Sequence, residues 1–325
     1  MRSASLTVYR KELADYFSSK IFIILLAFIY IIGLGFAYLS IQGIKSAPTS
    51  TDEALLVKVF IDEFIYLKLF TVGQVLSFNF VSFLSIFIPL IGILFGFNAI
   101  NSEKNSGNLS RLLSQPIYRD SVINGKFLAG ITTLTIMISS IVFIIIGIGI
   151  RSIGVPPTSE EILRIFIFII ICIIYGSFWM SLALLFSVIT KNIVGSILIS
   201  VPIWLFFVFF WGMIAKAIAD AAVPTGDQAT TAQLIKNGTV YLNLNRISPQ
   251  FLFLESVLTL INPTLQHIML RPVSSSALDR MLFNPLSISQ SMIQIWPQLV
   301  IIIALAFICF AISYVIFMKQ EIRST

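Results

Sequence analysis

Charged residues and histidine are scarce in this sequence. Only 11% of its 325 residues are Asp, Glu, Lys or Arg, and His267 is the single histidine. A metal site needs several donor side chains that converge, so one histidine does not predict a metal centre. The apolar stretches described below carry no ionisable residue in their central parts, where ion-coupled carriers usually place such groups. The sequence therefore disfavours a metalloenzyme and an ion-coupled carrier.

Catalytic motifs are also missing. The sequence has no Gly-x-x-x-x-Gly-Lys-Ser/Thr phosphate loop, so the chain cannot bind and hydrolyse ATP by that route. Intramembrane proteases and transferases need paired acids, a histidine cluster or a positioned nucleophile, and none of these patterns occurs. Cys172 and Cys309 lie in apolar stretches, where a thiol packs as a small apolar group. We expect that the chain is not an enzyme, and that another subunit supplies energy for any work it does.

Long apolar stretches dominate what is present. Hydrophobic residues make up 57% of the chain, and the mean hydropathy is +0.96. About 20 consecutive apolar residues cross a bilayer core. The sequence therefore predicts an all-α polytopic membrane protein with six transmembrane helices, at about 21–41, 72–97, 127–150, 162–189, 194–214 and 294–318. The first stretch is followed by no Ala-x-Ala-like cleavage site, so we interpret it as a retained span.

The segments between the spans complete the predicted organisation. Residues 1–20 place Leu6, Leu13 and Phe17 at helical spacing and are expected to form an interfacial helix. Spans one to five occupy 21–214, and the polar loop 98–126 lies between spans two and three. Residues 215–293 are expected to form the larger region outside the bilayer, and 319–325 a tail on the same side as the N-terminus.

The 215–293 region contains two features with alternative interpretations. Its segment 251–270 is apolar, but Glu255, Asn262, Pro263 and His267 interrupt it, so we expect a re-entrant or interfacial helix instead of a seventh span. Asn237 begins an Asn-x-Thr sequence, which is a candidate glycosylation site if this region faces the exterior. Such sequences also occur by chance.

Basic residues favour one orientation of the spans. Six spans put both termini on one side, and short segments rich in Lys and Arg usually face the cytoplasm. Here those segments are the N-terminal helix, the 98–126 loop, the turn at Lys191 and the tail. We therefore expect a multi-pass protein of the plasma membrane with both termini in the cytoplasm. Basic residues at span ends account for much of the net charge of +6, so the charge does not predict nucleic-acid binding.

The loop 98–126 carries the best indication of function. Leu109, Leu112 and Leu113 recur at helical spacing after a run of Asn, Ser and Gly, which predicts a short amphipathic helix that Pro116 ends. Such a helix can dock into a groove on a soluble partner, or it can lie on lipid. The residues alone leave both alternatives open. Charged residues surround the helix: Glu103, Lys104, Arg111, Arg119, Asp120 and Lys126.

Prolines, glycines and hydroxyl groups mark the interior of the spans. Pro89 is expected to kink span two and Pro202 to interrupt span five. Gly92 and Gly96 have the spacing of a close helix contact, either within one subunit or between two copies. Hydroxyl and amide groups within spans either line a conduit or join helices by hydrogen bonds. The candidate pathway-lining residues are Ser77, Asn79, Ser82, Ser85, Ser196 and Ser200.

The polar loop resembles a known signature. ABC-2 type permeases, the membrane subunits of one class of ATP-driven exporters, join spans two and three by Glu-x-x-x-Gly-Thr-Leu-x-x-Leu-Leu-Ser-x-Pro-x-x-Arg and a later Gly-Lys pair. The start YRKELADYFSSKIFIILL and the end FMKQEIRS are similar to the family's interfacial helix and basic tail. Asn108 stands where the family usually has threonine. The matching loop residues are Glu103, Gly107, Leu109, Leu112, Leu113, Ser114, Pro116, Arg119, Gly125 and Lys126.

The resemblance implies a function and a set of partners. A permease would pair with a second copy, or with a related chain, around a central pathway, and two cytoplasmic ATPase subunits carrying ATP and Mg²⁺ would dock beneath it. The leucines of the loop would form the apolar contact, Arg111 and Arg119 the charge partners, and Glu103 a hinge or a polar contact between subunits. Gly107, Pro116 and Lys126 complete the expected coupling loop. The alternatives are a six-span scaffold or receptor component without transport activity, and a carrier that follows an ion gradient.

Overall fold

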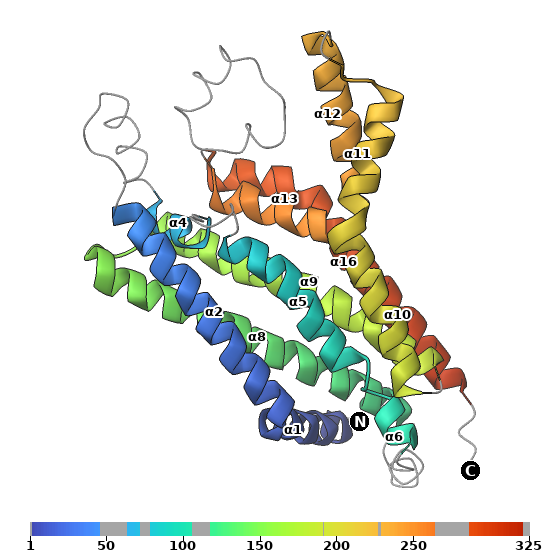
Figure 1. The fold of residues 1–325 in the computed structure, drawn as a ribbon. Helices are drawn as coiled ribbons and strands as arrows, with labels where there is room; N and C mark the ends of the chain where they lie inside the picture. The colour runs from blue at the N-terminus through green and yellow to red at the C-terminus, as the bar shows by residue number, and fades with distance from the viewer. Residues whose placement is uncertain are drawn as a thin grey trace.

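The protein is a bundle of long helices. The computed structural model describes residues 2–45, 64–71, 79–105, 118–190, 192–226, 229–263 and 286–320, and those residues contain helices and turns but no strand. Six helical stretches are long and apolar enough to cross a membrane, as the sequence predicts (Figure 1). They are α2 (Lys20–Lys45), α5 (Phe80–Gly96) continuing to Glu103, α8 (Arg119–Ile153), α9 (Ser159–Ile189), the stretch Ile193–Ala222, and α16 (Ile288–Lys319).

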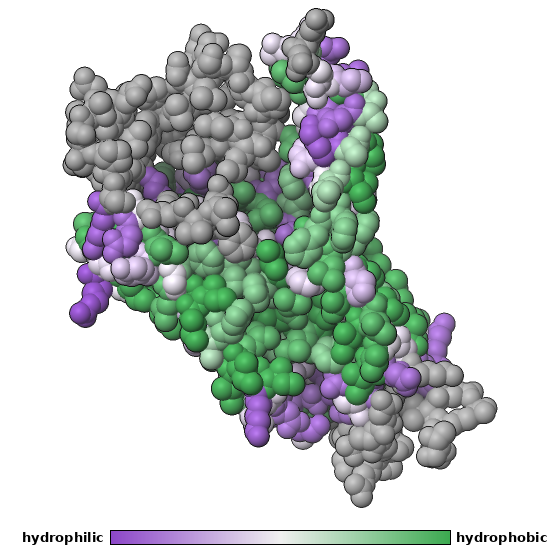
Figure 2. All heavy atoms as spheres, in the orientation of Figure 1, coloured by the Kyte–Doolittle hydropathy of each residue, from purple (hydrophilic) through white to green (hydrophobic). Residues whose placement is uncertain are grey.

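The bundle has two distinct ends. The N-terminal helix α1 (Arg2–Ser18), the short helix α6 (Asn101–Asn105) and the last turn of α16 lie at one end, here called the inner end (Figure 1). The short helix α4 (Ile65–Thr71) and the start of α9 lie at the opposite, outer end. Apolar side chains form a belt between the two ends, and hydrophilic side chains gather at the inner end (Figure 2). This distribution is what a bilayer-spanning bundle requires.

Helices α5 and α9 form the centre of the bundle. In their most apolar segments 67% and 61% of the residues are buried, against 17–22% for α2, α16 and the Ile193–Ala222 stretch. A Cβ atom added at Gly92 would lie 2.6 Å from the carbonyl oxygen of Gly176, and one at Gly96 would lie 2.5 Å from that of Met180. The Gly92 and Gly96 pair therefore serves close packing within one subunit. Helix α5 continues through Pro89.

The third long helix begins earlier than predicted. Helix α8 starts at Arg119, so Arg119, Asp120 and Lys126 belong to the helix and not to the loop between spans two and three. Asp120 lies in the first turn, where a negative charge favours the helix dipole. Val122 and Ile123 are fully buried, so the helix continues past its apolar span as an amphipathic segment.

The fifth stretch is longer than predicted and irregular. It consists of α10 (Ile193–Leu205), a π-helical turn η1 (Phe206–Phe210) and α11 (Trp211–Ala222). Pro202 has no amide hydrogen to donate within the helix, and the π-helical turn begins at Phe206, one helical turn later. Helix α12 (Thr231–Asn245) then runs back along α11, and the indole nitrogen of Trp211 donates to the Leu244 carbonyl at 3.0 Å. The described part of 215–293 thus begins with a helical hairpin (Figure 1).

Two short helices are buried at the outer end. Helix α13 (Pro249–Ile261) has 13 residues, about 20 Å, which is too short to cross the membrane core. It packs against α9, α16, α5 and α4, and residues 264–270 of the segment expected to be re-entrant or interfacial lie outside the described part. Glu255 does not interrupt this helix, because its carboxylate pairs with Arg246. Helix α4 is buried as well, and its residues Tyr66, Leu67 and Phe70 are at most 2% exposed.

Candidate functional site

Helix α1 lies across the inner end and packs on the start of α8. Val8 is buried, and a Cβ atom added at Gly125 would lie 2.9 Å from a methyl group of Val8, so glycine allows the two helices to approach closely. Leu6 and Phe17 are exposed on the other side of α1. Their exposure is what an interfacial helix needs, since that side can enter the lipid.

A buried ammonium group joins three segments of the inner end. Lys126 Nζ, on α8, lies 2.9 Å from Glu12 Oε1 on α1 and 2.9 Å from Glu103 Oε1 on α6. The side chains of Lys126, Glu12 and Glu103 are only 4%, 10% and 8% exposed. We call these three residues the inner triad. Because each of the two carboxylates depends on the same cation, displacement of one of the three segments disturbs the other two.

Lys11 lies at the water-exposed rim of the inner triad. Its ammonium group is 3.2 Å from Glu12 Oε1, 3.7 Å from Glu103 Oε1 and 3.5 Å from Asp15 Oδ2, and its side chain is 53% exposed. Partial burial lowers the pKa of Lys11, but Glu12, Glu103 and Asp15 raise it more, so the net pKa lies above the usual value. The rim cation therefore stays charged at neutral pH.

The chain just before residues 106–117 is fixed to the end of α9 and the turn that follows it. The Ser187 hydroxyl accepts from the amides of Ile100 and Asn101 at 3.1 and 3.2 Å. The Asn101 side-chain amide donates to Thr190 Oγ1 at 3.0 Å and to the Asn192 carbonyl at 3.3 Å. These bonds satisfy backbone donors that the start of α6 would otherwise leave open.

The chain just after residues 106–117 is fixed to the end of α16. A terminal nitrogen of Arg119 donates to the Gln320 carbonyl at 2.6 Å. The side-chain amide of Gln320 donates in turn to the Val188 carbonyl near the end of α9 at 2.8 Å. The two segments that flank residues 106–117 are thus attached to α9 and to the end of α16.

The sequence places the chain in a known family. The sequence matches the model of ABC-2 family transporter proteins over residues 6–322. The chain belongs to the ABC-2 transporter family. No curated protein matches it significantly. As a member of this family the chain is a multi-pass membrane subunit of an ABC transporter, and such subunits pair with ABC ATPase subunits and are generally not catalytic themselves.

The residues predicted for the coupling loop of this ABC-2 protein fall into two groups. Glu103 and Lys126 are brought together in the inner triad, and Arg119 is engaged by the end of α16. The others lie in 106–117, outside the described residues: Gly107, Leu109, Arg111, Leu112, Leu113 and Pro116.

The candidate pathway residues that the structure describes bond mainly within their own helices. Asn79 caps α5 by accepting from the Ser82 amide at 2.9 Å, and the Ser85 hydroxyl donates to the Ser82 carbonyl at 2.7 Å. On α10 the Ser200 hydroxyl donates to the Ser196 carbonyl at 2.8 Å, and both serines are fully buried. Ser77 lies outside the described residues. Among the described residues of the set, Asn79 and Ser85 also bond to another helix: the Asn79 amide donates to the Thr71 carbonyl of α4 at 3.0 Å, and the Gln250 side chain of α13 donates to the Ser85 hydroxyl at 3.4 Å.

Asn237 is poorly placed for a glycan. Its side-chain nitrogen, to which the sugar would be attached, donates to Asp220 Oδ1 at 2.9 Å and to the Val223 carbonyl at 2.8 Å. The residue is 4% exposed inside the α11 and α12 hairpin. The folded hairpin therefore uses this nitrogen to hold its two helices together, which argues against glycosylation there.

Sequence reasoning missed Glu12, Lys11 and Asn101. A signal for Glu12 exists, because Val8, Glu12 and Tyr16 recur every four residues and define the side of α1 that faces the protein. The more apolar side, with Leu6 and Phe17, suggested the opposite face. Asn101 had no signal beyond its place in a run of polar residues.

Proposed function

We propose that this ABC-2 subunit is an exporter permease that works as a pair around a central pathway and is driven by two cytoplasmic ATPases docked on residues 106–117. The inner end then faces the cytoplasm. The inner triad is the observation that carries the proposal. Lys126 on α8 binds Glu12 of α1 and also Glu103, which lies in the segment that leads into residues 106–117. A force that the ATPases exert on residues 106–117 is therefore transmitted to several helices together.

The physical requirement for coupling is a difference in binding between nucleotide states. Closure of the ATPases on ATP and Mg²⁺ must favour one arrangement of the membrane helices over another, and a ligand shifts such an equilibrium only by its differential affinity. Leu109, Leu112 and Leu113 provide the apolar contact with the ATPase, and Arg111 provides a charge partner. Arg119 acts inside the subunit, where its bond to Gln320 keeps the loop anchored. Gly107 and Pro116 bound the short amphipathic helix that the sequence predicts between them, which we call the docking helix.

Charge substitutions in the docking helix test this proposal. With Leu112→Asp and Leu113→Asp, two carboxylates enter an apolar contact and lose their hydration, so the ATP hydrolysis activity that co-purifies with the tagged chain from its native membrane should fall at least about tenfold. The matched control is Leu234→Asp with Ile235→Asp on α12, an adjacent apolar pair of which each residue is 45% exposed. The control should retain the co-purifying activity. Undiminished activity with the docking-helix variant would contradict the docking role.

A thiol at Ser106 tests the orientation. In a chain with Cys172→Ala and Cys309→Ala, we expect Ser106→Cys to resist a membrane-impermeant maleimide on intact cells and to react after permeabilisation. Ala222→Cys, at the exposed end of α11, is the control and should react on intact cells. Labelling of Ser106→Cys from outside would place the loop on the wrong side for a cytoplasmic ATPase.

A further inference from the structure

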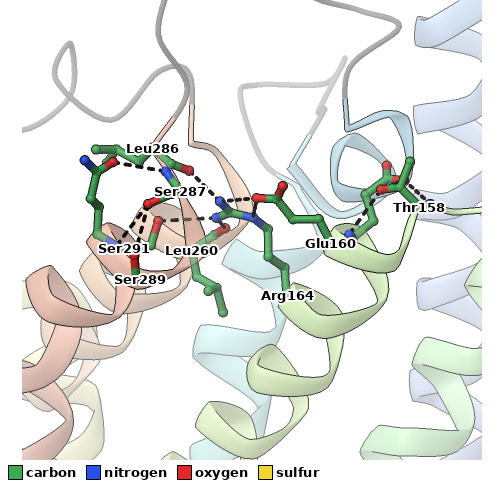
Figure 3. A network of polar contacts seen from close by, with 10 residues as sticks. Thr158, Glu160, Arg164, Leu260, Leu286, Ser287, Ser289 and Ser291 are labelled. Atoms are coloured by element: carbon green, nitrogen blue, oxygen red, sulfur yellow. Dashed lines mark hydrogen bonds and ion pairs between the residues drawn. The ribbon is translucent and has the colours of Figure 1, made fainter.

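A second buried cation organises the outer end of the bundle. Arg164, on α9, is fully buried, and all five of its N–H groups have an acceptor (Figure 3). Glu160 Oε1 accepts twice, at 3.0 and 2.8 Å, while the carbonyls of Leu260 and Leu286 accept at 2.7 and 2.5 Å and Ser291 Oγ at 3.3 Å. The ring of Phe64 lies 5.4 Å from the guanidinium carbon.

The acceptors come from α9 itself, from α13 and from the segment that leads into α16, and Arg164 binds all three. Leu260 lies in the last turn of α13, where carbonyl groups have no partner within the helix and carry the negative end of the helix dipole. Leu286 directly precedes the N-cap of α16, Ser291 lies near the start of that helix, and Glu160 belongs to α9 itself. A guanidinium is well suited to this position, since it is always charged and donates in several directions.

The opposite end of α13 covers a candidate pathway residue. Gln250, in the first turn of α13, donates to Ser85 Oγ on α5 at 3.4 Å. Three residues further along, Phe253 stacks on Tyr175 with ring centroids 4.3 Å apart, and the Tyr175 hydroxyl donates to the Ser85 carbonyl at 3.0 Å. Ser85 is 1% exposed. Helix α13 therefore shields Ser85 from the outer end.

Helix α13 has few polar attachments to the spans. Glu255 pairs with Arg246, which precedes α13 in the chain, so this ion pair holds α13 to its own connection and not to a span. Its other buried residues are mainly apolar and include Leu252, Val257 and Leu260. Within the described residues, Arg164 is the only charged side chain that binds α13 to a spanning helix.

We propose that α13 is a plug over the outer end of the pathway, and that Arg164 is the positioning residue that holds the plug closed. The inference rests on the proposed pathway role of Ser85. When the bonds from Arg164 are lost, the C-terminal end of α13 loses its charged attachment to α9, and the helix is held by its apolar packing, the Gln250 hydrogen bond and the Phe253 ring contact. The helix then separates from α5 and α9 more readily, and Ser85 becomes accessible to water.

Thiol labelling at Ser85 tests the plug. The protein carries Ser85→Cys with Cys172→Ala and Cys309→Ala, and is reacted with a membrane-impermeant maleimide in lipid nanodiscs. Arg164→Gln should raise the labelling rate at least tenfold. Arg164→Lys, which retains the charge but offers three donors in place of five, should raise it less. The control Lys216→Gln removes a half-exposed cation on α11 that does not contact α13, and should leave the rate unchanged.

A second thiol separates plug release from general unfolding. Ser313→Cys lies on α16, is fully buried, and is far along the chain from the Arg164 contacts at the start of that helix. With Arg164→Gln it should stay as unreactive as in the parent protein. An unchanged rate at Ser85→Cys, or an equal rise at both thiols, would overturn the proposal. The measurement requires no ATPase, so its failure is independent of the docking test.

Discussion

Lys126→Met is expected to destabilise the folded protein by about 3–5 kcal/mol, the usual cost of removing one partner from a buried ion pair. Methionine fills a similar volume but leaves the carboxylates of Glu12 and Glu103, which are 10% and 8% exposed, without the ammonium group 2.9 Å from each. The two like charges then repel each other in a poorly hydrated space. The loss should appear as a lower free energy of unfolding in mixed micelles and as reduced co-purification of ATPase activity.

The chain offers a matched control for this substitution. Lys11→Met removes a cation that contacts the same carboxylates from the exposed rim, where ion pairs contribute roughly 0–1 kcal/mol. Combining Lys126→Met with Glu12→Gln and Glu103→Gln removes the repulsion and should restore most of the stability. Equal costs for Lys126→Met and Lys11→Met would show that burial does not matter at the inner triad.

Gly96→Ala should destabilise the protein by about 3 kcal/mol, near the upper end of what overpacking usually costs. The added Cβ atom would lie 2.5 Å from the Met180 carbonyl oxygen, 2.7 Å from Ala183 Cβ and 2.8 Å from the Leu184 amide nitrogen. Two of these neighbours are backbone atoms, which cannot move aside as a flexible side chain can. Helix α5 must therefore separate from α9, and equilibrium unfolding should report the lost packing.

The same substitution elsewhere should have the opposite sign. Gly147 lies inside α8 with nothing within 4 Å of an added Cβ atom, so Gly147→Ala is expected to stabilise the protein by about 0.5–1 kcal/mol through the better helix propensity of alanine. Combining Gly96→Ala with Ala183→Gly should recover only part of the loss, because the Met180 carbonyl remains in the way. A Gly96→Ala variant as stable as the parent would mean that the two helices are not packed this closely.

The sequence was sufficient for the six spans because the bilayer imposes a simple rule. A backbone in hydrocarbon must satisfy its own hydrogen bonds, so a long apolar stretch has to be helical, and its length fixes the number of crossings. The ends of the spans followed no such rule. Helix α8 begins at Arg119 because Val122 and Ile123 bury against neighbouring helices, which a count of charged residues in the loop does not reveal.

The inner triad was only half predictable, for a related reason. Glu103 and Lys126 could be selected by their resemblance to a family pattern, but their contact with Glu12 depends on which side of α1 faces the protein. In water the most apolar side of a helix is buried, whereas an interfacial helix turns that side to lipid. Glu255 presents the same difficulty. From the sequence, this charge is expected to interrupt the apolar segment, but its ion pair with Arg246 offsets the cost of burying the carboxylate.

The glycine contacts between α5 and α9 restrict how the subunit can change shape. Sliding one helix along another requires side chains that can step from one groove to the next, but here the main chains themselves interlock at Gly92 with Gly176 and at Gly96 with Met180. Helices α5 and α9 must therefore move together as one rigid body. Any motion that carries a signal from the level of Lys126 to the level of Arg164 has to be a rotation or tilt of that body against the helices around it.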